Sequence, residues 1–291
     1  MLDIYFLGTS SGIPSVYRGM PCIALRWQGE VILWDVGECC QRALMKHKVG
    51  YGSIRNIFIS HLHLDHFLGI YGLIETLRMT THIDSLNVFA PSRFKELLIN
   101  KWPFIKLKRL RESTLLRGKD FTISAFKVKH VKGSYGFVFK QDDKIKFYKE
   151  KARKLGLKGK MFREIQEKGS LNINGRVVEL KDISYVKKGI KIVYSGDTAF
   201  SQNLVRHAKN ADLLIHEATF DESLEEEARE TNHSTVKDAA LAASKANVKH
   251  LVLTHISGRY KDDDSLYLAQ AEKYFKGKIT VAYDGLKITL R

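Results

Sequence analysis

The chain has 291 residues, of which 44% are hydrophobic and 27% charged, a composition that fits a globular protein and excludes a disordered or collagen-like one. Its 48 lysines and arginines against 32 aspartates and glutamates give a net charge of +16, which favours a polyanionic partner such as nucleic acid or an anionic membrane surface. No signal peptide and no bilayer-spanning apolar run are expected, and three cysteines without a C-x-x-C pair favour a reducing, cytoplasmic setting over a disulfide framework.

The first predicted elements are short strands separated by tight turns. Strands are expected over 3–8, 22–27 and 30–34, with a Gly- and Ser-containing loop from Gly8 to Gly19. A helix over 36–46 follows, and a buried strand over 55–60 then leads directly into a histidine-rich run. Beyond it we expect helices over 66–78 and 92–100 and strands over 86–90, 121–129 and 136–140.

Residues 141–190 interrupt this pattern because they are highly charged and short of aliphatic core positions. We expect this insertion to be too small and too polar to form an independent domain. Alternation resumes after it, with strands over 190–194, 212–215, 250–254, 278–283 and 286–290 and helices over 200–208, 235–246 and 262–276. The order of elements predicts one α/β domain over residues 1–291, in which helices cover two mixed sheets.

Metal-ligand side chains are concentrated just after the strand over 55–60, where His61, His63, Asp65 and His66 fall within six residues. Alternate residues of an extended loop point the same way, so His61 and His63 converge on one ion. Asp65 and His66 come as the chain turns into a helix, which directs them at a second point. Imidazole and carboxylate ligands suit zinc, with manganese or iron as substitutes. The run therefore predicts two metal ions.

Three further ligand-type residues each follow an apolar strand: His130, Asp197 and His255. An aspartate such as Asp197 can bridge two ions and hold them about 3.5–4 Å apart, the spacing used in two-metal hydrolysis. A hydroxide held between the ions is then the natural nucleophile. The electrophile stays open at this point, because a phosphodiester, a lactam, a thioester or a sulfate ester would each fit.

The pattern H-x-H-x-D-H followed by a later His, Asp and His resembles the metallo-β-lactamase superfamily, which implies a four-layer αββα sandwich. Nearly the whole chain is similar to the ribonuclease Z family of tRNA 3′-processing endonucleases within that superfamily. The similarity rests on motifs at Phe6–Pro14, Asp35–Glu38, Ile59–His61, His216–Phe220 (the HEAT motif), His233–Thr235 (the HST motif) and Leu253–Tyr260.

The resemblance implies a role for each matching residue. One zinc would be held by His61, His63, His130 and Asp197, and a second by Asp65, His66, His255 and the shared Asp197. Asp65 would also act as general base, and His233 with Glu217 would protonate the leaving oxygen. The expected reaction is attack of a zinc-held hydroxide on precursor tRNA, which leaves a 3′-hydroxyl on the tRNA and a 5′-phosphate on the 3′ trailer.

The segment 144–163 carries nine lysines and arginines against Glu150 alone, a net charge of +8. A charge run is usually a solvated face, but the resemblance implies a protruding arm that grips tRNA through phosphate contacts. The residues expected to bind RNA are Lys151, Arg153, Lys154, Lys158, Lys160 and Arg163 in the arm, with Arg18, Ser257 and Arg259 outside it. Two departures concern the arm turn, which lacks a proline, and the loop Pro14–Gly19, which keeps Pro and Arg but loses the family's Lys and Asn.

Two other functions compete with this interpretation. A small-molecule hydrolase on the same fold, arylsulfatase-like or phosphodiesterase-like, would turn over small esters and ignore tRNA. A non-catalytic RNA-binding module with a vestigial metal site would bind RNA without cleaving it. Family members of this length are commonly homodimers, which is expected here as well. The histidines without ligand-like neighbours are interpreted as structural or surface residues: His47, His82, His207 and His250.

Overall fold

The computed structural model describes residues 1–81, 83–98, 102–260 and 264–291. His82 lies outside these residues, as does one end of each of the helices expected over 92–100 and 262–276. The described chain forms two compact units, a first unit of Met1–Lys140 with Ile190–Arg291 and a second unit of Gln141–Gly189. No helix among the described residues is long and apolar enough to cross a membrane.

Within its described residues, the first unit is built on two seven-stranded sheets, and the first sheet has the order β20–β1–β3–β4–β5–β6–β7. Neighbouring strands are antiparallel from β20 to β4 and parallel from β4 to β7. The expected strands at the start of the chain and over 55–60 and 86–90 are confirmed. The bounds are β1 (Leu2–Gly8), β3 (Cys22–Trp27), β4 (Glu30–Trp34), β5 (Ile54–Phe58), β6 (Leu86–Ala90), β7 (Ile105–Arg109) and β20 (Lys287–Leu290).

The second sheet has the order β19–β17–β16–β15–β10–β9–β8. The four strands β15, β16, β17 and β19 are parallel, as strand–helix alternation predicts, because parallel neighbours need a crossover connection. The bounds are β8 (Ser113–Arg117), β9 (Phe121–Lys127), β10 (Tyr135–Gln141), β15 (Lys191–Tyr194), β16 (Leu213–Glu217), β17 (His250–Thr254) and β19 (Lys278–Val281). Helices α8 (Gln202–Ala208), α9 (Glu225–Thr231), α10 (Val236–Lys245) and α11 (Ser265–Tyr274) lie in the connections.

The last two strands belong to different sheets. Strand β19 pairs with β17, whereas β20 pairs with β1, so the turn at Asp284-Gly285 carries the chain from one sheet to the other. Asp284 accepts hydrogen bonds from the Thr9 hydroxyl at 2.8 Å and from the Gly19 amide at 2.7 Å. This carboxylate therefore fixes the N-terminal loop next to the crossing point.

The core between the sheets is rich in aromatic side chains. Trp34 of the first sheet stacks on Tyr194 of the second with ring centroids 5.8 Å apart, and Phe58 stacks on Phe89 at 4.4 Å. Each sheet also has an apolar outer face, because the strands are buried on both sides. Aromatic rings supply much of the buried area that holds two such layers together.

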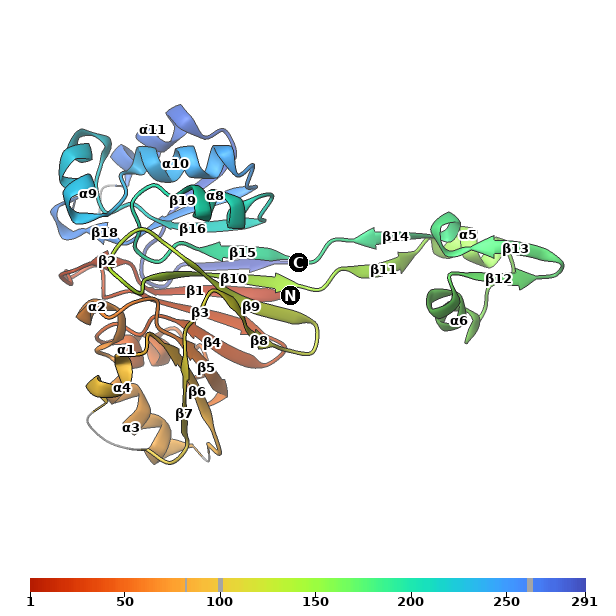
Figure 1. Cartoon of the computed structure of the whole chain (residues 1–291), viewed down its shortest axis with the longest axis horizontal. Coiled ribbons are helices and arrows are strands. Elements are labelled where there is room, and N and C mark those ends of the chain that lie inside the picture. The colour runs from red at the N-terminus through yellow and green to blue at the C-terminus, as the bar shows by residue number, and fades with distance from the viewer. Residues whose placement is uncertain (82, 99–101, 261–263) are drawn as a thin grey trace. The chain divides into compact units, whose positions relative to one another are not determined.

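Helices cover the outer faces of both sheets (Figure 1). Residues of α1 (Cys40–Lys46) and α3 (Ile70–Thr80) pack in one cluster with the first sheet, and residues of α8, α10 and α11 pack in another with the second. The expected four-layer αββα sandwich is therefore confirmed. Two short helices, α2 (Leu64–Phe67) and α4 (Phe94–Leu97), complete the first side.

Two local expectations were wrong. The helix expected over 66–78 is divided into α2 and α3 around Gly69, where an added Cβ would stand 2.0 Å from the Gly37 carbonyl oxygen. Strands β7 and β8 were not anticipated, because β7 alternates lysine with aliphatic residues and is mostly exposed. Lysine-rich strands are typical of sheet edges, where they discourage pairing with other chains.

The second unit has a hydrophobic core of its own. Its buried cluster comprises Ala152, Leu157, Ile165, Ile173, Val178 and Ile183. These apolar residues are spaced singly among charged ones in the sequence and converge only in three dimensions. The elements are β11 (Lys144–Phe147), α5 (Lys149–Lys154), α6 (Met161–Lys168), β12 (Ser170–Ile173), β13 (Arg176–Glu179), α7 (Leu180–Ile183) and β14 (Ser184–Lys187).

Candidate metal centre

The predicted ligands lie past the ends of strands that belong to both sheets. His61 and His66 follow β5 of the first sheet, and Asp197 and His255 follow β15 and β17 of the second. Because carboxyl ends of parallel strands meet at one edge of a sheet, loops at that edge commonly form the functional site. His130 comes from the loop between β9 and β10.

Two sets of ligand atoms converge at this edge. The side chains of His61, His63, His130 and Asp197 form one set and those of Asp65, His66 and His255 another, with the ligand atoms of each set within 4.8 Å of one another. Asp197 links the sets, because its Oδ2 lies 3.2 Å from His66 Nε2, 3.3 Å from His255 Nε2 and 3.6 Å from His61 Nε2. The structure thus brings together all seven residues predicted as ligands.

Four of the predicted histidine ligands are held through their other ring nitrogen, and the first is His61, whose Nδ1 lies 3.0 Å from Ser60 Oγ. His66 Nδ1 lies 2.8 Å from Asp35 Oδ2, His130 Nδ1 lies 3.0 Å from the Asn232 carbonyl oxygen, and His255 Nδ1 lies 2.9 Å from Thr219 Oγ1. Metal-binding histidines are typically oriented in this way, which fixes the ring and leaves the opposite nitrogen for the ion. In each case Nε2 is the atom left facing the other ligands.

The spacing of the ligand atoms fits zinc. Two atoms that each lie about 2.1 Å from a tetrahedral zinc are about 3.4 Å apart. His66 Nε2 and His255 Nε2 are 3.3 Å apart, and His130 Nε2 and His63 Nδ1 are 3.1 Å apart. Among the described residues, His61 Nε2 and Asp197 Oδ1 are buried without a hydrogen-bond partner. Buried polar atoms are rarely left unpaired, so these two atoms fit the role of ligands to a cation.

The surroundings set most of these side chains in the protonation state that a ligand needs. Burial is the main cause that lowers the pKa of His61, His63 and His130, which favours neutral imidazole. Burial alone would raise the pKa of Asp197, but the charges of His255 and His66 hold it well below its usual value. His66 differs, because Asp197 and Asp35 overcome burial and raise its pKa. A cation would displace that proton on binding.

Asp35 contacts the predicted ligand His66, although the sequence pattern assigned Asp35 no role. Its carboxylate accepts hydrogen bonds from the Ser60 hydroxyl and the Tyr194 hydroxyl, both at 2.8 Å, and contacts His66. Asp35 and the ligand His255 both have left-handed backbone conformations, with φ of 56° and 58°. Such conformations in non-glycine residues concentrate at functional sites. The only signal in the sequence was the motif Asp35–Glu38, which indicated a family but no contact.

Glu217, which is buried, and His233, which is half-buried, form a pair beside the predicted metal ligands. His233 Nδ1 lies 2.8 Å from Glu217 Oε1, and the Thr198 amide and the Thr219 hydroxyl donate to the same carboxylate at 2.8 Å each. Burial lowers the pKa of His233, but the charge and hydrogen bond of Glu217 outweigh it and raise the pKa to about 9. His233 is therefore protonated at neutral pH and has Nε2 available as a proton donor.

The residues around this pair also fix its position in the fold. Thr235 is the N-cap of α10 and forms a capping box with Asp238. The Ser234 amide donates to Glu217 at 3.1 Å. The start of a well-capped helix thereby holds His233 against the end of β16.

Arg18 and Arg259 lie outside the second unit and were also expected to bind RNA, but they differ in exposure and in hydrogen-bond partners. Arg18 is 4% exposed, and its guanidinium donates to Asp264 at 2.8 Å, to the Thr9 hydroxyl and to the Ala282 carbonyl. This guanidinium is committed to internal partners, so its geometry does not support RNA contact. Arg259 is exposed, makes a bidentate ion pair with Glu227 and donates to the Ser257 hydroxyl.

The six predicted RNA-binding residues of the second unit are all exposed. Lys151, Arg153 and Lys154 lie on α5, and Arg163 on α6 pairs with Glu167 at 2.8 Å. Gly156 and Gly159 turn the chain between these helices with φ of 88° and 51°, which replaces the proline-containing turn of the family. The structure therefore presents these cations to solvent along one continuous stretch of chain.

Comparison with known proteins gives consistent matches. Two family models match, one described as anti-Pycsar protein Apyc1 over residues 2–168 and one described as a beta-lactamase superfamily domain over residues 174–256. A ribonuclease Z from Archaeoglobus fulgidus is 39% identical over 96% of this chain and 95% of its own length. Each family model covers part of the chain, whereas this relative covers nearly all of it.

Solved structures show the same relationship. The human tRNase Z, short form, is 28% identical and superposes with a TM-score of 0.69 over 99% of each chain. The metallo-beta-lactamase fold protein YhfI from Bacillus subtilis has a TM-score of 0.74 over 99% of this chain and 98% of its own, with 18% identity. The second likeness concerns the fold alone.

Proposed function

The chain belongs to the ribonuclease Z family of the metallo-β-lactamase superfamily, and from this premise we propose how it carries out its reaction. The resemblance found in the sequence is confirmed by these relatives. The chain is accordingly a metal-dependent hydrolase, an endoribonuclease of tRNA 3′ processing. We also propose which metals the chain binds, which residues act in cleavage, which products form and which segments bind tRNA.

We propose two zinc ions as the resident metals. His61, His63, His130 and Asp197 would hold one, and Asp65, His66, His255 and the shared Asp197 would hold the other. The observation that supports this most directly is the convergence of both ligand sets on Asp197, whose Oδ1 and whose neighbour His61 Nε2 lack partners among the described residues. When bound, such ions polarise a phosphoryl oxygen and lower the pKa of water towards about 7.

Asp65 is proposed to orient the attacking water. Its Oδ2 accepts a hydrogen bond from the Gly12 amide at 3.0 Å, which fixes the carboxylate at the mouth of the centre. Burial would raise its pKa, but hydrogen bonding and charge from His255, with the charge of His66, hold the pKa far below its usual value. A carboxylate that stays ionised accepts a hydrogen bond from water well but retains a proton poorly, so we assign Asp65 to alignment of the water.

His233 is proposed to protonate the leaving oxygen. The attacking water first gives one proton to solvent, a new bond then forms between its oxygen and phosphorus, and the bond between phosphorus and the tRNA O3′ breaks. His233 Nε2 gives its proton to that O3′, since Nδ1 is engaged by Glu217. The tRNA then ends in a 3′-hydroxyl, and the trailer begins with a 5′-phosphate. Glu217 keeps the imidazole protonated beforehand and orients it during the transfer.

The second unit is proposed to be the tRNA-binding arm. It carries a dense run of exposed cations, and Lys151, Arg153, Lys154 and Lys158 make no ion pair within this fully described unit, unlike Arg163, Lys168 and Lys181. Cations that lack acidic neighbours are available for phosphates, which give affinity without reading sequence. The core of this unit would keep the cations on a defined surface, which suits recognition of a folded RNA by shape.

The proposal is tested with precursor tRNA carrying a 3′ trailer. Purified protein should cleave it once, chelator should abolish cleavage, and added zinc should restore it. End mapping should find a 3′-hydroxyl on the tRNA and a 5′-phosphate on the trailer. The Asp65→Ala variant should lose cleavage by a factor of about 10² or more and still bind precursor.

The same assay separates the competing functions. Full activity of Asp65→Ala would contradict the assigned role, and a 3′-phosphate on the tRNA would contradict the assigned leaving group. A protein that hydrolyses bis(p-nitrophenyl) phosphate but leaves precursor tRNA intact would be a small-molecule hydrolase. Binding of precursor without cleavage of either substrate in the presence of zinc would indicate an RNA-binding module.

We further propose a homodimer in the cytoplasm. The homodimer rests on family resemblance, and sedimentation of the purified protein should give twice the chain mass of 33.3 kDa. The location is supported by three free cysteines, Cys22, Cys39 and Cys40, which suit a reducing compartment. Sedimentation at the mass of a single chain would contradict the dimer.

A further inference from the structure

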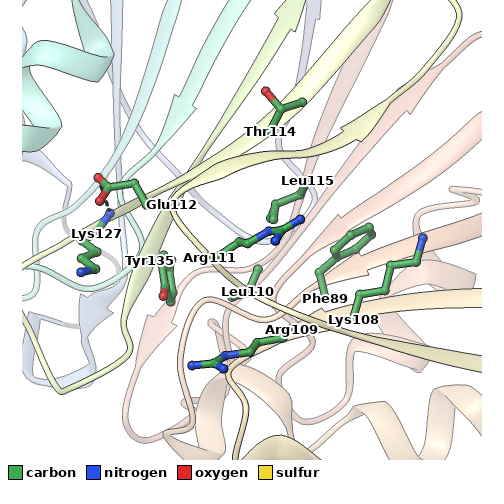
Figure 2. Close-up of a pocket in the computed structure, with 10 residues that line it drawn as sticks. All are labelled: Phe89, Lys108, Arg109, Leu110, Arg111, Glu112, Thr114, Leu115, Lys127 and Tyr135. Atoms are coloured by element: carbon green, nitrogen blue, oxygen red, sulfur yellow. Dashed lines mark hydrogen bonds between the residues drawn. The ribbon is translucent and has the colours of Figure 1, made fainter.

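A basic cavity of about 680 Å³ lies in the first unit and contains none of the proposed metal ligands or catalytic residues. It is lined by the end of β7, the segment that leads into β8, the end of β9 and the start of β10 (Figure 2). Its walls combine long cationic side chains with apolar and aromatic ones. The lining residues are Phe89, Lys108, Arg109, Leu110, Arg111, Glu112, Thr114, Leu115, Lys127 and Tyr135.

The charge of the cavity is strongly positive. Lys108, Arg109, Arg111 and Lys127 are exposed, and none of their side chains has an ion-pair partner in the described part of the chain. Glu112 is the one acidic residue in the lining. Its Oε1 lies 3.4 Å from the Lys127 amide nitrogen and 3.3 Å from Asn203 Nδ2, so this carboxylate is turned to local donors (Figure 2).

Two aromatic residues, Phe89 and Tyr135, line the cavity. Lys108 Nζ lies 5.2 Å from the centre of the Phe89 ring, which holds the ammonium at the edge of the hollow. Tyr135 is half-buried and faces the cavity with Leu115 and Leu110 around it (Figure 2). Cations that follow a backbone, together with aromatic faces on which bases stack, are the usual composition of a single-strand binding site.

The cavity adjoins the metal centre through one loop. The loop that carries His130 begins after Lys127 and ends at Tyr135, and both of these residues line the cavity. The Tyr135 amide donates to the carbonyl of Ser60, the residue just before His61, at 3.1 Å. The cavity and the proposed metal centre therefore share this loop and the hydrogen bond that anchors its end.

We propose that this cavity binds the single-stranded 3′ trailer of the substrate, an inference that rests on the proposed function. Its volume is that of a site for a ligand-sized group, about 300–1,000 Å³, and suits nucleotides of a single strand rather than a duplex. The acceptor stem of a tRNA is a duplex up to the region of the cut, and the RNA beyond the cut is single-stranded. The cations hold trailer phosphates, and Tyr135 provides a face for a base.

The test compares precursors with trailers of one and of twelve nucleotides. In the Lys108→Ala/Arg111→Ala variant, KM for the long-trailer precursor should rise about tenfold more than KM for the short-trailer precursor. The matched control is Lys106→Ala/Arg117→Ala, which removes two exposed cations of β7 and β8 that do not line the cavity. The control should change both KM values by the same factor, because it alters only the net charge.

A binding measurement gives an independent readout. A fluorescent twelve-nucleotide oligouridylate, titrated with protein in the presence of chelator, should bind the Lys108→Ala/Arg111→Ala variant about tenfold more weakly than wild type. The slope of log Kd against log salt should fall by about 1.4, which is the value for two single-strand contacts. Equal loss of affinity in the control variant, or no loss in either, would overturn the proposal.

The two proposals fail in different ways. If wild-type protein cleaved no precursor but the oligouridylate results held, the proposed function would fall and the single-strand site would stand. If precursor were cleaved and KM were independent of trailer length in wild type and variant alike, the trailer site would fall and the proposed function would stand.

Discussion

Glu217 and His233 illustrate how single residues at the centre depend on their neighbours. A histidine buried at this position would be neutral at neutral pH, because burial lowers its pKa. The carboxylate 2.8 Å away reverses that preference and raises the pKa to about 9. Glu217 stays ionised, since the charge of His233 outweighs burial and lowers the pKa of that carboxyl. The proposed proton donor therefore depends on a pair of residues.

The Glu217→Gln variant isolates this charge. Glutamine keeps the size of the side chain and can still accept from the Thr219 hydroxyl, but it cannot stabilise an imidazolium. We expect kcat for precursor tRNA to fall by a factor of about 10²–10³, while the Kd for precursor, measured with chelator present, changes less than about twofold. The exposed Glu272→Gln variant is the control and should match wild type. A large increase in Kd with kcat unchanged would place Glu217 in binding instead.

His250 allows a prediction on stability at a residue outside the proposed ligand set. It begins β17, is 6% exposed, and its Nε2 lies 2.9 Å from the Thr280 hydroxyl. Burial, with the charge of Lys278, lowers its pKa to about 4. The folded protein therefore holds it neutral at pH values where the unfolded chain, with a pKa of about 6.5, already takes up a proton.

This difference should appear as a pH-dependent loss of stability. The contribution of neutral His250 is present above about pH 6.5 and is lost as the pH falls towards 4, amounting to up to about 3 kcal/mol. The free energy of unfolding, measured by urea denaturation with chelator at pH 7, 5 and 4, should fall more steeply in wild type than in His250→Gln. Parallel pH profiles for the two proteins would show that His250 is not the group responsible.

Among the helices and strands of the first unit, the ends of strands carry most residues of the proposed centre. β5, β15, β16 and β17 each end in or just before a residue of the centre, and each can do so because the strand itself is buried and rigid. In the second unit, by contrast, a helix rather than a strand end carries several of the residues proposed to bind tRNA. Its short helix α5 buries Ala152 alone and directs its cations to solvent, so a small core supports a large charged surface.

The cations of α5 give a prediction about tRNA affinity. The Lys151→Ala/Lys154→Ala variant should weaken binding to precursor tRNA by about tenfold at physiological salt and reduce the slope of log Kd against log salt by about 1.8. The matched control is Lys168→Ala/Lys181→Ala in the same unit, because these lysines pair with Glu164 and Glu179. Equal effects of the two variants on fluorescence-anisotropy titrations would mean that only net charge matters and that α5 is a solvated face.

The residues of the proposed centre come from both sheets of the first unit. Its ligands run from His61 to His255 along the chain, and they come from two sheets that pack through Trp34, Tyr194 and their neighbours. Five imidazoles and two carboxylates share a small volume there. An ion that binds this arrangement in the folded chain and not in the unfolded one therefore stabilises the fold by mass action.

Removal of metal should accordingly destabilise the protein. At zinc concentrations about 100-fold above Kd, binding contributes about 2.7 kcal/mol, so chelator should lower Tm by about 5–10 °C. Scanning fluorimetry with chelator, and then with excess zinc, measures this change and its reversal. In the His255→Ala variant the zinc-dependent shift should be much smaller. An unchanged Tm in wild-type protein known to have lost its metal would contradict a ligand set of this kind.

The fold class, the family and the candidate ligand types could be predicted from the sequence alone, because they depend on local features. H-x-H-x-D-H is contiguous, each later ligand follows a recognisable strand, and strand–helix alternation indicates the layers. Strand β7 escaped prediction because lysine alternation on an exposed edge resembles a loop.

Which residues contact one another could be seen only in the folded protein. The tertiary structure placed Asp35 behind His66, committed Arg18 to Asp264, gathered six scattered apolar residues into the core of the second unit, and enclosed a basic cavity beside the His130 loop. The physical reason is that burial, pKa and the partners of a charge depend on residues distant in the chain. Residues that are far apart in the sequence can lie a few ångströms apart in the folded protein, and the sequence alone does not show which ones do.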